Sequence, residues 1–138
     1  MLVVTGGAGF IGSALIWALN ERGRDDLLIV DTLGSDAKWK NLLGKRFLRI
    51  VAPDVFLESL DELDGQIEGI LHIGAITDTS ATDADAIYLE NTVFTRDLAE
   101  YAIASDIRFI YASSASVYGD GALGFSDDDS LTPKLLPM

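Results

Sequence analysis

A glycine-rich segment between two apolar stretches constrains the fold of this chain more than any other feature. Residues 5–12 read Thr-Gly-Gly-Ala-Gly-Phe-Ile-Gly, and the preceding residues 2–4 are the apolar run Leu-Val-Val. After the glycines, residues 10–22 place apolar side chains at helical spacing, and Gly23 follows where such a helix would end. The pattern predicts a buried strand, a tight turn and a helix. The spaced apolar residues are Ile11, Leu15, Ala18 and Leu19.

The same alternation of strand and helix continues along the chain. Residues 27–30 form a second apolar run that ends at Asp31, which completes a strand-helix-strand unit of about 30 residues with parallel strands. Pro53 suits the first turn of a helix, and Leu89, Val93 and Leu98 are expected to face inward from a later one. The whole pattern predicts an α/β fold, a Rossmann-type doubly wound parallel sheet. Further strands are predicted at 47–51, 67–73 and 108–112, and further helices at 53–63 and 83–104.

Composition excludes several classes of protein. A chain of 138 residues with 49% hydrophobic and 23% charged residues matches one ordinary globular domain. No apolar run approaches the roughly 20 residues that span a bilayer, and no basic stretch precedes an apolar one at the N-terminus, so we expect a cytoplasmic protein without a membrane partner. The chain has no cysteine and one histidine, which argues against a metal site.

Charge is distributed unevenly. The net charge is −12, with +2 in residues 1–50 and −14 in residues 51–138. This balance disfavours nucleic acid as a partner, because affinity for the phosphate backbone comes from Lys and Arg. An anionic ligand is expected to bind the first half of the chain.

The glycine segment predicts a binding site for a dinucleotide. Glycine permits the tight turn, lets the backbone approach a pyrophosphate, and lets the helix pack on the strand. Asp31 follows Gly12 by nineteen residues and is placed to accept hydrogen bonds from a ribose diol, which favours NAD. Lys38 and Lys40 follow in the same loop, where they either neutralise a 2'-phosphate or are ordinary solvated lysines. The choice between NAD and NADP therefore stays open.

A cluster of hydroxyl groups follows the predicted strand 108–112. Residues 113–116 read Ser-Ser-Ala-Ser, at the carboxyl edge where open α/β sheets bind ligands. A serine in this place can donate a hydrogen bond to a developing alkoxide or carbonyl oxygen. The alternative interpretation is a polar loop that caps the next element.

Together these segments resemble the extended short-chain dehydrogenase/reductase superfamily, and within it the NAD-dependent epimerase/dehydratase family of nucleotide-sugar epimerases. The resemblance rests on residues 5–12, on Asp31, on 72–75 (His-Ile-Gly-Ala) and on 113–119 (Ser-Ser-Ala-Ser-Val-Tyr-Gly). It extends to the ADP-heptose 6-epimerase subfamily through residues 37–42, 77–80 and the pair Glu90-Asn91. It implies a nucleotide-sugar substrate, a place in lipopolysaccharide biosynthesis and a homo-oligomer when full length.

The resemblance also implies roles for individual residues. Ser114 would be the catalytic serine, and no metal is involved. His72 is expected to be a neutral, hydrogen-bonded histidine at a strand end rather than a catalytic group. The implied cofactor-binding residues are Gly6, Gly9, Phe10, Ile11, Gly12, Asp31, Thr32, Lys38, Ala75 and Asn91, and the implied substrate-binding residues are Thr79, Ser80 and Ser116.

The chain departs from the family pattern at several points. Residues 49–51 (Arg-Ile-Val) lack the acid that many relatives place near adenine, and Asp78 stands where the subfamily usually has uncharged hydroxyls. The family's Tyr-x-x-x-Lys does not occur, although residues 136–138 (Leu-Pro-Met) resemble the approach to it. We therefore expect residues 1–138 to be an incomplete NAD(P)-binding domain without its substrate-binding part, inactive on its own.

Two other functions stay open. A dehydratase or reductase of the same superfamily is one, but dehydratases carry an acidic pair after the catalytic hydroxyl, and here those places are Ala115 and Ser116. Elimination would then lack the acid that protonates the leaving oxygen. The other is a protein that binds NAD(P) without chemistry, because one fold hosts many functions.

Overall fold

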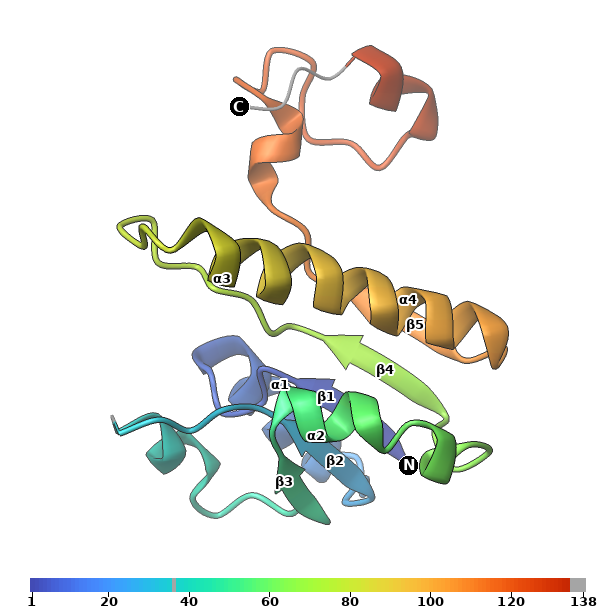
Figure 1. Cartoon of the computed structure of the whole chain (residues 1–138). Helices are drawn as coiled ribbons and strands as arrows, with labels where there is room; N and C mark the ends of the chain where they lie inside the picture. Colours follow the sequence, from blue (N-terminus) through green and yellow to red (C-terminus); the bar gives the residue numbers. More distant parts are fainter. Residues whose placement is uncertain (36, 135–138) are drawn as a thin grey trace.

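A five-stranded parallel sheet forms the centre of the computed structural model, which describes residues 1–35 and 37–134 (Figure 1). The strand order is β3-β2-β1-β4-β5, and every neighbouring pair is parallel. The predicted Rossmann-type fold class is confirmed. Residues 136–138, which resemble the approach to the family's catalytic motif, lie outside the described residues. The strands are β1 (Leu2–Thr5), β2 (Leu27–Val30), β3 (Arg49–Val51), β4 (Gly69–His72) and β5 (Arg108–Tyr111).

Helices cover both faces of the sheet. Val3 and Val4 of β1 point to opposite faces, as successive strand residues must, and both are fully buried. Val3 belongs to a core with Phe56 and Leu98, whereas Val4 packs with Ile16. One face is therefore covered by α2 and α4, and the other by α1. The helices are α1 (Phe10–Glu21), α2 (Pro53–Glu58), α3 (Ala84–Tyr88) and α4 (Phe94–Ala104).

The order of the strands creates a reversal next to β1. The chain proceeds outward from β1 to β2 and β3, and then crosses to β4 on the other side of β1. At such a reversal the connections after β1 and β4 leave the sheet in opposite directions and open a crevice at the carboxyl edge. The fold thus brings the glycine-rich turn beside the residues that follow β4.

The predicted helix 83–104 differs from a regular helix. It contains a π-helical turn, Leu89–Val93, between α3 and α4. A π turn holds an extra residue and rotates the preceding helix relative to the following one. Leu98 is fully buried as predicted, but the prediction that Leu89 faces inward is wrong, because its side chain is 57% exposed.

The predicted helix 53–63 is also shorter than expected. Here α2 ends at Glu58, and a 3-10 turn, Asp61–Leu63, follows. The Ser59 hydroxyl donates to the Phe56 carbonyl oxygen at 2.9 Å, which offers that carbonyl an alternative to the helical pattern. Phe56 and Leu63 still reach the same core.

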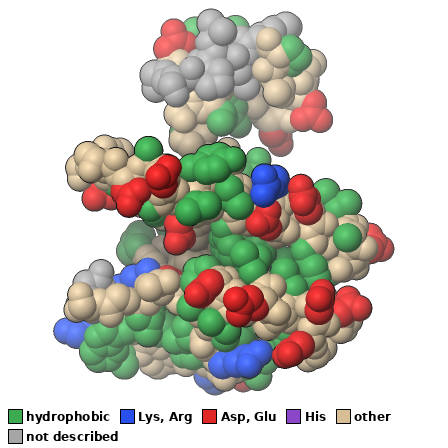
Figure 2. Space-filling view, viewed as in Figure 1, with side chains coloured by type: hydrophobic (Ala, Val, Ile, Leu, Met, Phe, Trp, Pro, Cys, Tyr) green, Lys and Arg blue, Asp and Glu red, His purple; other side chains and the backbone are tan. Residues whose placement is uncertain are grey.

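After β5 the chain leaves the layers and forms two 3-10 helices, Ala115–Tyr118 and Asp129–Lys134 (orange to red in Figure 1). The space-filling view shows more acidic than basic side chains, among exposed hydrophobic ones, on the face that carries α2 and α4 (Figure 2). Among the described residues, no helix has the length and apolar character needed to cross a membrane.

Candidate functional site

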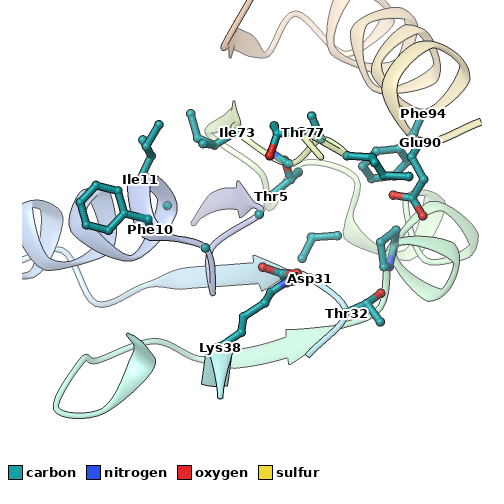
Figure 3. A pocket seen from close by; sticks show the side chains of 18 residues that line it. Thr5, Phe10, Ile11, Asp31, Thr32, Lys38, Ile73, Thr77, Glu90 and Phe94 are labelled. Atoms are coloured by element: carbon teal, nitrogen blue, oxygen red, sulfur yellow. Dashed lines mark hydrogen bonds and ion pairs between the residues drawn. The ribbon is translucent and has the colours of Figure 1, made fainter. Parts of the chain in front are cut away.

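A cavity of about 480 Å³ opens at the carboxyl edge of the sheet, where β1, β2 and β4 end (Figure 3). Its size falls in the range of small-molecule and cofactor sites. Nine of the ten predicted cofactor-binding residues line it, all except Asn91. The lining residues are Thr5, Gly6, Gly9, Phe10, Ile11, Gly12, Val30, Asp31, Thr32, Lys38, Pro53, Ile73, Gly74, Ala75, Ile76, Thr77, Glu90 and Phe94.

Close backbone contacts form the floor of this cavity. Gly6 has a φ of +63°, and a Cβ there would lie 2.6 Å from the Gly74 Cα. A Cβ at Gly12 would overlap the Gly6 carbonyl oxygen. Side chains at these positions would therefore separate β1, α1 and the segment after β4, which explains why the turn needs glycine.

The N-terminus of α1 points unpaired amides at the cavity. The first intrahelical bond runs from the Ser13 amide to the Gly9 carbonyl oxygen at 2.9 Å, and Gly9 provides no side-chain cap. The amides of Phe10, Ile11 and Gly12 consequently lack intrahelical acceptors, and all three residues line the cavity. These donors and the positive end of the helix dipole fit the pyrophosphate of a dinucleotide.

Asp31 lies in the cavity wall with its carboxylate held by the protein. Its Oδ2 accepts a hydrogen bond from the Ala8 amide at 2.8 Å, and its Oδ1 pairs with Lys38 Nζ at 2.6 Å. The Asp31 side chain is 6% exposed. A carboxylate has about four acceptor positions, so these two contacts fix its orientation and leave capacity for ribose hydroxyls. The predicted role in binding ribose stays a prediction.

A buried histidine connects β1, β4 and the helix above them. Thr5 Oγ1 accepts from the Gly74 amide at 3.0 Å and lies 2.6 Å from His72 Nδ1. On the other side of the ring, His72 Nε2 lies 2.8 Å from Thr95 Oγ1, which itself donates to the Asn91 carbonyl oxygen at 2.9 Å. Thr95 uses its one proton on the Asn91 carbonyl oxygen, so Nε2–H must donate to Thr95. The contact therefore assigns a proton to Nε2, and in the neutral ring Nδ1 accepts from the Thr5 hydroxyl.

The ionisation of His72 agrees with this assignment. The residue is 3% exposed, and burial lowers its pKa because the charged ring would lose its hydration. Both ring nitrogens are occupied within the protein. The arrangement favours the structural role expected from the sequence over a catalytic one.

Asn91, in the π turn, holds the segment after β4. Its Oδ1 accepts from the Ile76 amide at 2.7 Å, and its Nδ2 donates to the Ile76 carbonyl oxygen at 2.9 Å. Ile76 lines the cavity, whereas Asn91 itself does not. The structure therefore gives Asn91 a positioning contact; its predicted direct contact with the cofactor stays a prediction.

The predicted catalytic serine lies beyond the cavity wall. Ser114 caps the 3-10 helix 115–118, is exposed, and places its Oγ 2.8 Å from the Ser116 Oγ. The Ala112 amide donates to the His72 carbonyl oxygen at 3.0 Å, so the chain leaves β5 at the same sheet edge as the residues after β4. The fold brings the hydroxyl cluster to the right edge, but neither serine lines the cavity.

The predicted substrate residues Thr79 and Ser80 lie in an exposed turn outside the cavity. Asp78 Oδ1 accepts from the Ser80 amide at 2.8 Å and from the Ser80 hydroxyl at 2.6 Å. These hydrogen bonds lower the pKa of Asp78. The Asp78 carboxylate thus organises its own turn.

Nine of the cavity residues do not belong to the predicted site, and three of them, Pro53, Glu90 and Phe94, come from α2, the π turn and α4. Pro53 was interpreted only as a helix start, and Glu90 only as the neighbour of Asn91. Their proximity depends on how α2 and the π turn pack over the sheet, which no local pattern reveals. The described residues contain no group of three potential ligands that could hold a metal ion.

Comparison with known proteins gives a consistent result. The sequence profile of the "NAD dependent epimerase/dehydratase family" matches residues 2–137. An ADP-L-glycero-D-manno-heptose-6-epimerase of Nitratidesulfovibrio vulgaris (strain DP4) is 44% identical over 140 residues, covering 100% of this chain and 43% of the relative. One of Fusobacterium nucleatum is 42% identical over 142 residues, with the same coverage. The chain thus spans less than half the length of these relatives.

Solved structures show the same relationship. The Helicobacter pylori ADP-L-glycero-D-manno-heptose-6-epimerase superposes with a TM-score of 0.77 at 27% identity, covering 93% of this chain and 43% of the other. The UDP-glucuronic acid 4-epimerase of Bacillus cereus, in complex with NAD, gives 0.76 at 29% identity, covering 99% and 45%.

Proposed function

Because the chain belongs to the NAD dependent epimerase/dehydratase family, we propose that it forms the cofactor-binding part of a nucleotide-sugar epimerase that acts on ADP-heptose. The observation that carries this proposal is the cavity at the glycine turn, where unpaired amides of α1 and the Asp31 carboxylate meet. The heptose substrate is supported by the relatives of that name, which are 42% and 44% identical to this chain. The role in lipopolysaccharide biosynthesis, the homo-oligomer and the cytoplasmic location are parts of the same proposal.

The residues of the cavity suit a dinucleotide. Gly6, Gly9 and Gly12 admit the pyrophosphate close to the backbone, and Asp31 accepts hydrogen bonds from the adenosine ribose. When bound, NAD(P) supplies hydride acceptance and return, so that the sugar carbon is oxidised and then reduced from its opposite face. Ala75 and Thr77, after β4, line the same cavity and limit the space beside the cofactor.

The cofactor is NADP or NAD, with NADP favoured. Lys38 Nζ lies 2.6 Å from Asp31 Oδ1, so a cation stands beside the carboxylate that would otherwise repel a 2'-phosphate. The ion pair also orients Asp31 for the ribose of NAD. The NAD complexes among the similar structures support use of NAD.

Ser114 is the catalytic residue that we propose in this chain. Its hydroxyl would donate to the reacting sugar oxygen and stabilise the charge that changes during hydride transfer. Ser116 Oγ, 2.8 Å away, would orient that hydroxyl or contact the substrate. The family's Tyr-x-x-x-Lys does not occur in these 138 residues, so this chain alone is expected to be inactive.

The decisive experiment measures epimerisation of ADP-heptose by the complete gene product that carries this chain. Ser114→Ala is expected to lower kcat by about 10²- to 10³-fold, because one donor to the developing charge is lost. Ser113→Ala, one residue earlier in the same cluster, is the matched control and should retain most activity. Absence of epimerisation by the wild-type product, or full activity of Ser114→Ala, would overturn the assignment.

A further inference from the structure

One carboxylate in the cavity has no role in the function proposed above. Glu90, in the π turn, lines the cavity together with Phe94. Figure 3 shows these two labelled residues across the cavity from Phe10 and Ile11, with the Glu90 carboxylate directed toward the interior. Within the residues that the structure describes, Glu90 makes no hydrogen bond or ion pair, in contrast to Asp31.

The position of Glu90 corresponds to the base end of a bound dinucleotide. If the α1 amides hold the pyrophosphate and Asp31 holds the ribose, the base lies beyond Asp31, toward β3 and α2. Pro53, Glu90 and Phe94 line the cavity there and also border a second, smaller cavity of about 230 Å³ between α2 and the π turn. The base end is therefore walled by a proline ring, a buried phenylalanine and one carboxylate.

This wall has the chemistry that recognises adenine. The apolar rings suit the face of a purine, and a carboxylate is an acceptor only, so it favours a base that presents a donor. Adenine offers its 6-amino group. The end of β3 supplies no acid for this purpose, because its residues are Arg49, Ile50 and Val51. An acceptor at this end must come from another element, and the π turn places one there.

We propose that Glu90 accepts a hydrogen bond from the 6-amino group of the cofactor's adenine and makes the cavity selective for adenine over 6-oxopurines. The inference rests on the proposed dinucleotide function. A hypoxanthine base presents a carbonyl oxygen at position 6, and its lone pairs face the Glu90 carboxylate. The amino group is thus favoured by a charge-assisted hydrogen bond and the carbonyl is disfavoured by repulsion.

The test compares NAD with nicotinamide hypoxanthine dinucleotide, in which only the base differs. Binding of each to the complete gene product is measured by isothermal titration calorimetry, for wild type and for Glu90→Gln. Gln retains the shape but can rotate its amide to donate to a carbonyl oxygen. The matched control is Asp54→Asn, which removes an exposed carboxylate that borders only the second cavity.

Wild type and Asp54→Asn are expected to bind NAD about one to two orders of magnitude more tightly than the hypoxanthine analogue, whereas Glu90→Gln should bind the two with similar affinity. Equal affinities in wild type, or unchanged discrimination in Glu90→Gln, would overturn the role of Glu90 while NAD binding itself still supports the proposed function. Failure of the folded wild type to bind either NAD or NADP would overturn both.

Discussion

At the scale of residues, buried polar side chains decide how the cavity is held together. Every buried side-chain nitrogen or oxygen among the described residues has a hydrogen-bond partner. Thr5 and His72 join β1 to β4, and Asp31 joins the end of β2 to the glycine turn through the Ala8 amide. Such groups stabilise the fold only while each partner is present and in the correct protonation state.

Protonation of His72 is expected to destabilise the protein. Burial lowers its pKa in the folded chain below the ordinary value of 6.5. Between that lowered pKa and 6.5 the unfolded chain binds more protons, so stability is full above 6.5 and decreases as the pH falls. The loss is at most about 1.4 kcal/mol per pH unit in this window.

The measurement is the free energy of unfolding in urea at pH 7.5 and pH 5.5, for wild type and His72→Gln. Gln can accept from Thr5 and donate to Thr95 without titrating in this range. Wild type should lose more stability than the variant over this interval. Parallel curves for the two proteins would contradict the prediction.

Lys38 is expected to distinguish the two cofactors. Lys38→Ala removes the cation beside Asp31, which leaves the carboxylate facing a 2'-phosphate without compensation. NADP affinity should fall at least about tenfold more than NAD affinity. Calorimetric titrations with both cofactors check this. The control is Lys40→Ala, because Lys40 shares the short 3-10 helix Lys38–Leu42 with Lys38 but does not line the cavity. If Lys38→Ala lost equal affinity for NAD and for NADP, the role of Lys38 in cofactor binding would be limited to orienting Asp31.

At the scale of elements, α1 packs closely against the turn after β1 only because the residues at the contact are glycines, which have no side chains. Gly12 lies in the first turn of α1 and meets the backbone of Gly6 and Gly7. Gly9 precedes the helix and has more space, since its Cβ would lie 3.1 Å from the Gly6 carbonyl oxygen. Two glycines of one motif therefore serve different purposes.

This difference predicts opposite behaviour for two alanine variants. Gly12→Ala should destabilise the fold by roughly 1–3 kcal/mol, because α1 must move away from β1. Gly9→Ala should retain most of the stability and weaken NAD(P) binding, because the methyl group enters the space of the pyrophosphate. Thermal unfolding and calorimetry of the same two proteins separate the effects. Unchanged NAD(P) affinity in a well-folded Gly9→Ala variant would show that the glycine turn does not contribute to cofactor binding.

At the scale of the whole molecule, the sheet ends in an exposed edge. β5 pairs only with β4 among the described strands, and Ile110 and Tyr111 on it are 50% and 55% exposed. An edge strand with apolar side chains and unpaired backbone groups is a template for association with another chain. Strand β2, by contrast, is buried along its whole length.

The 138-residue chain is therefore expected to self-associate at micromolar concentration. Ile110→Lys should reduce this association, because a charged residue on the edge disfavours pairing with a second strand. Ile103→Lys on α4, at a position 80% exposed and away from the edge, is the control and should change it less. Sedimentation velocity measures the effect. A monomeric wild-type chain, or equal effects of both variants, would contradict the prediction.

The sequence by itself determined the succession of strands and helices along the chain and the position of the glycine turn. Period and composition are local properties, so the run 27–30, the spacing to Asp31 and the glycines at 6, 9 and 12 were sufficient to predict the parallel sheet and the part of the cavity formed by the glycine turn and Asp31. Glycine is required where two backbone segments are in direct contact, and this requirement can be recognised from the sequence alone.

Only the tertiary structure decided which distant residues share the cavity. The attachment of Asn91 to Ile76 and the position of Glu90 in the cavity wall both depend on packing between separate elements of the fold. Leu89 shows the limit of local patterns directly: its apolar character suited an inward position, yet it lies in the π turn and is 57% exposed. Helical periodicity fixes relative angles only while the hydrogen-bond pattern is regular, and that pattern is set by contacts between elements.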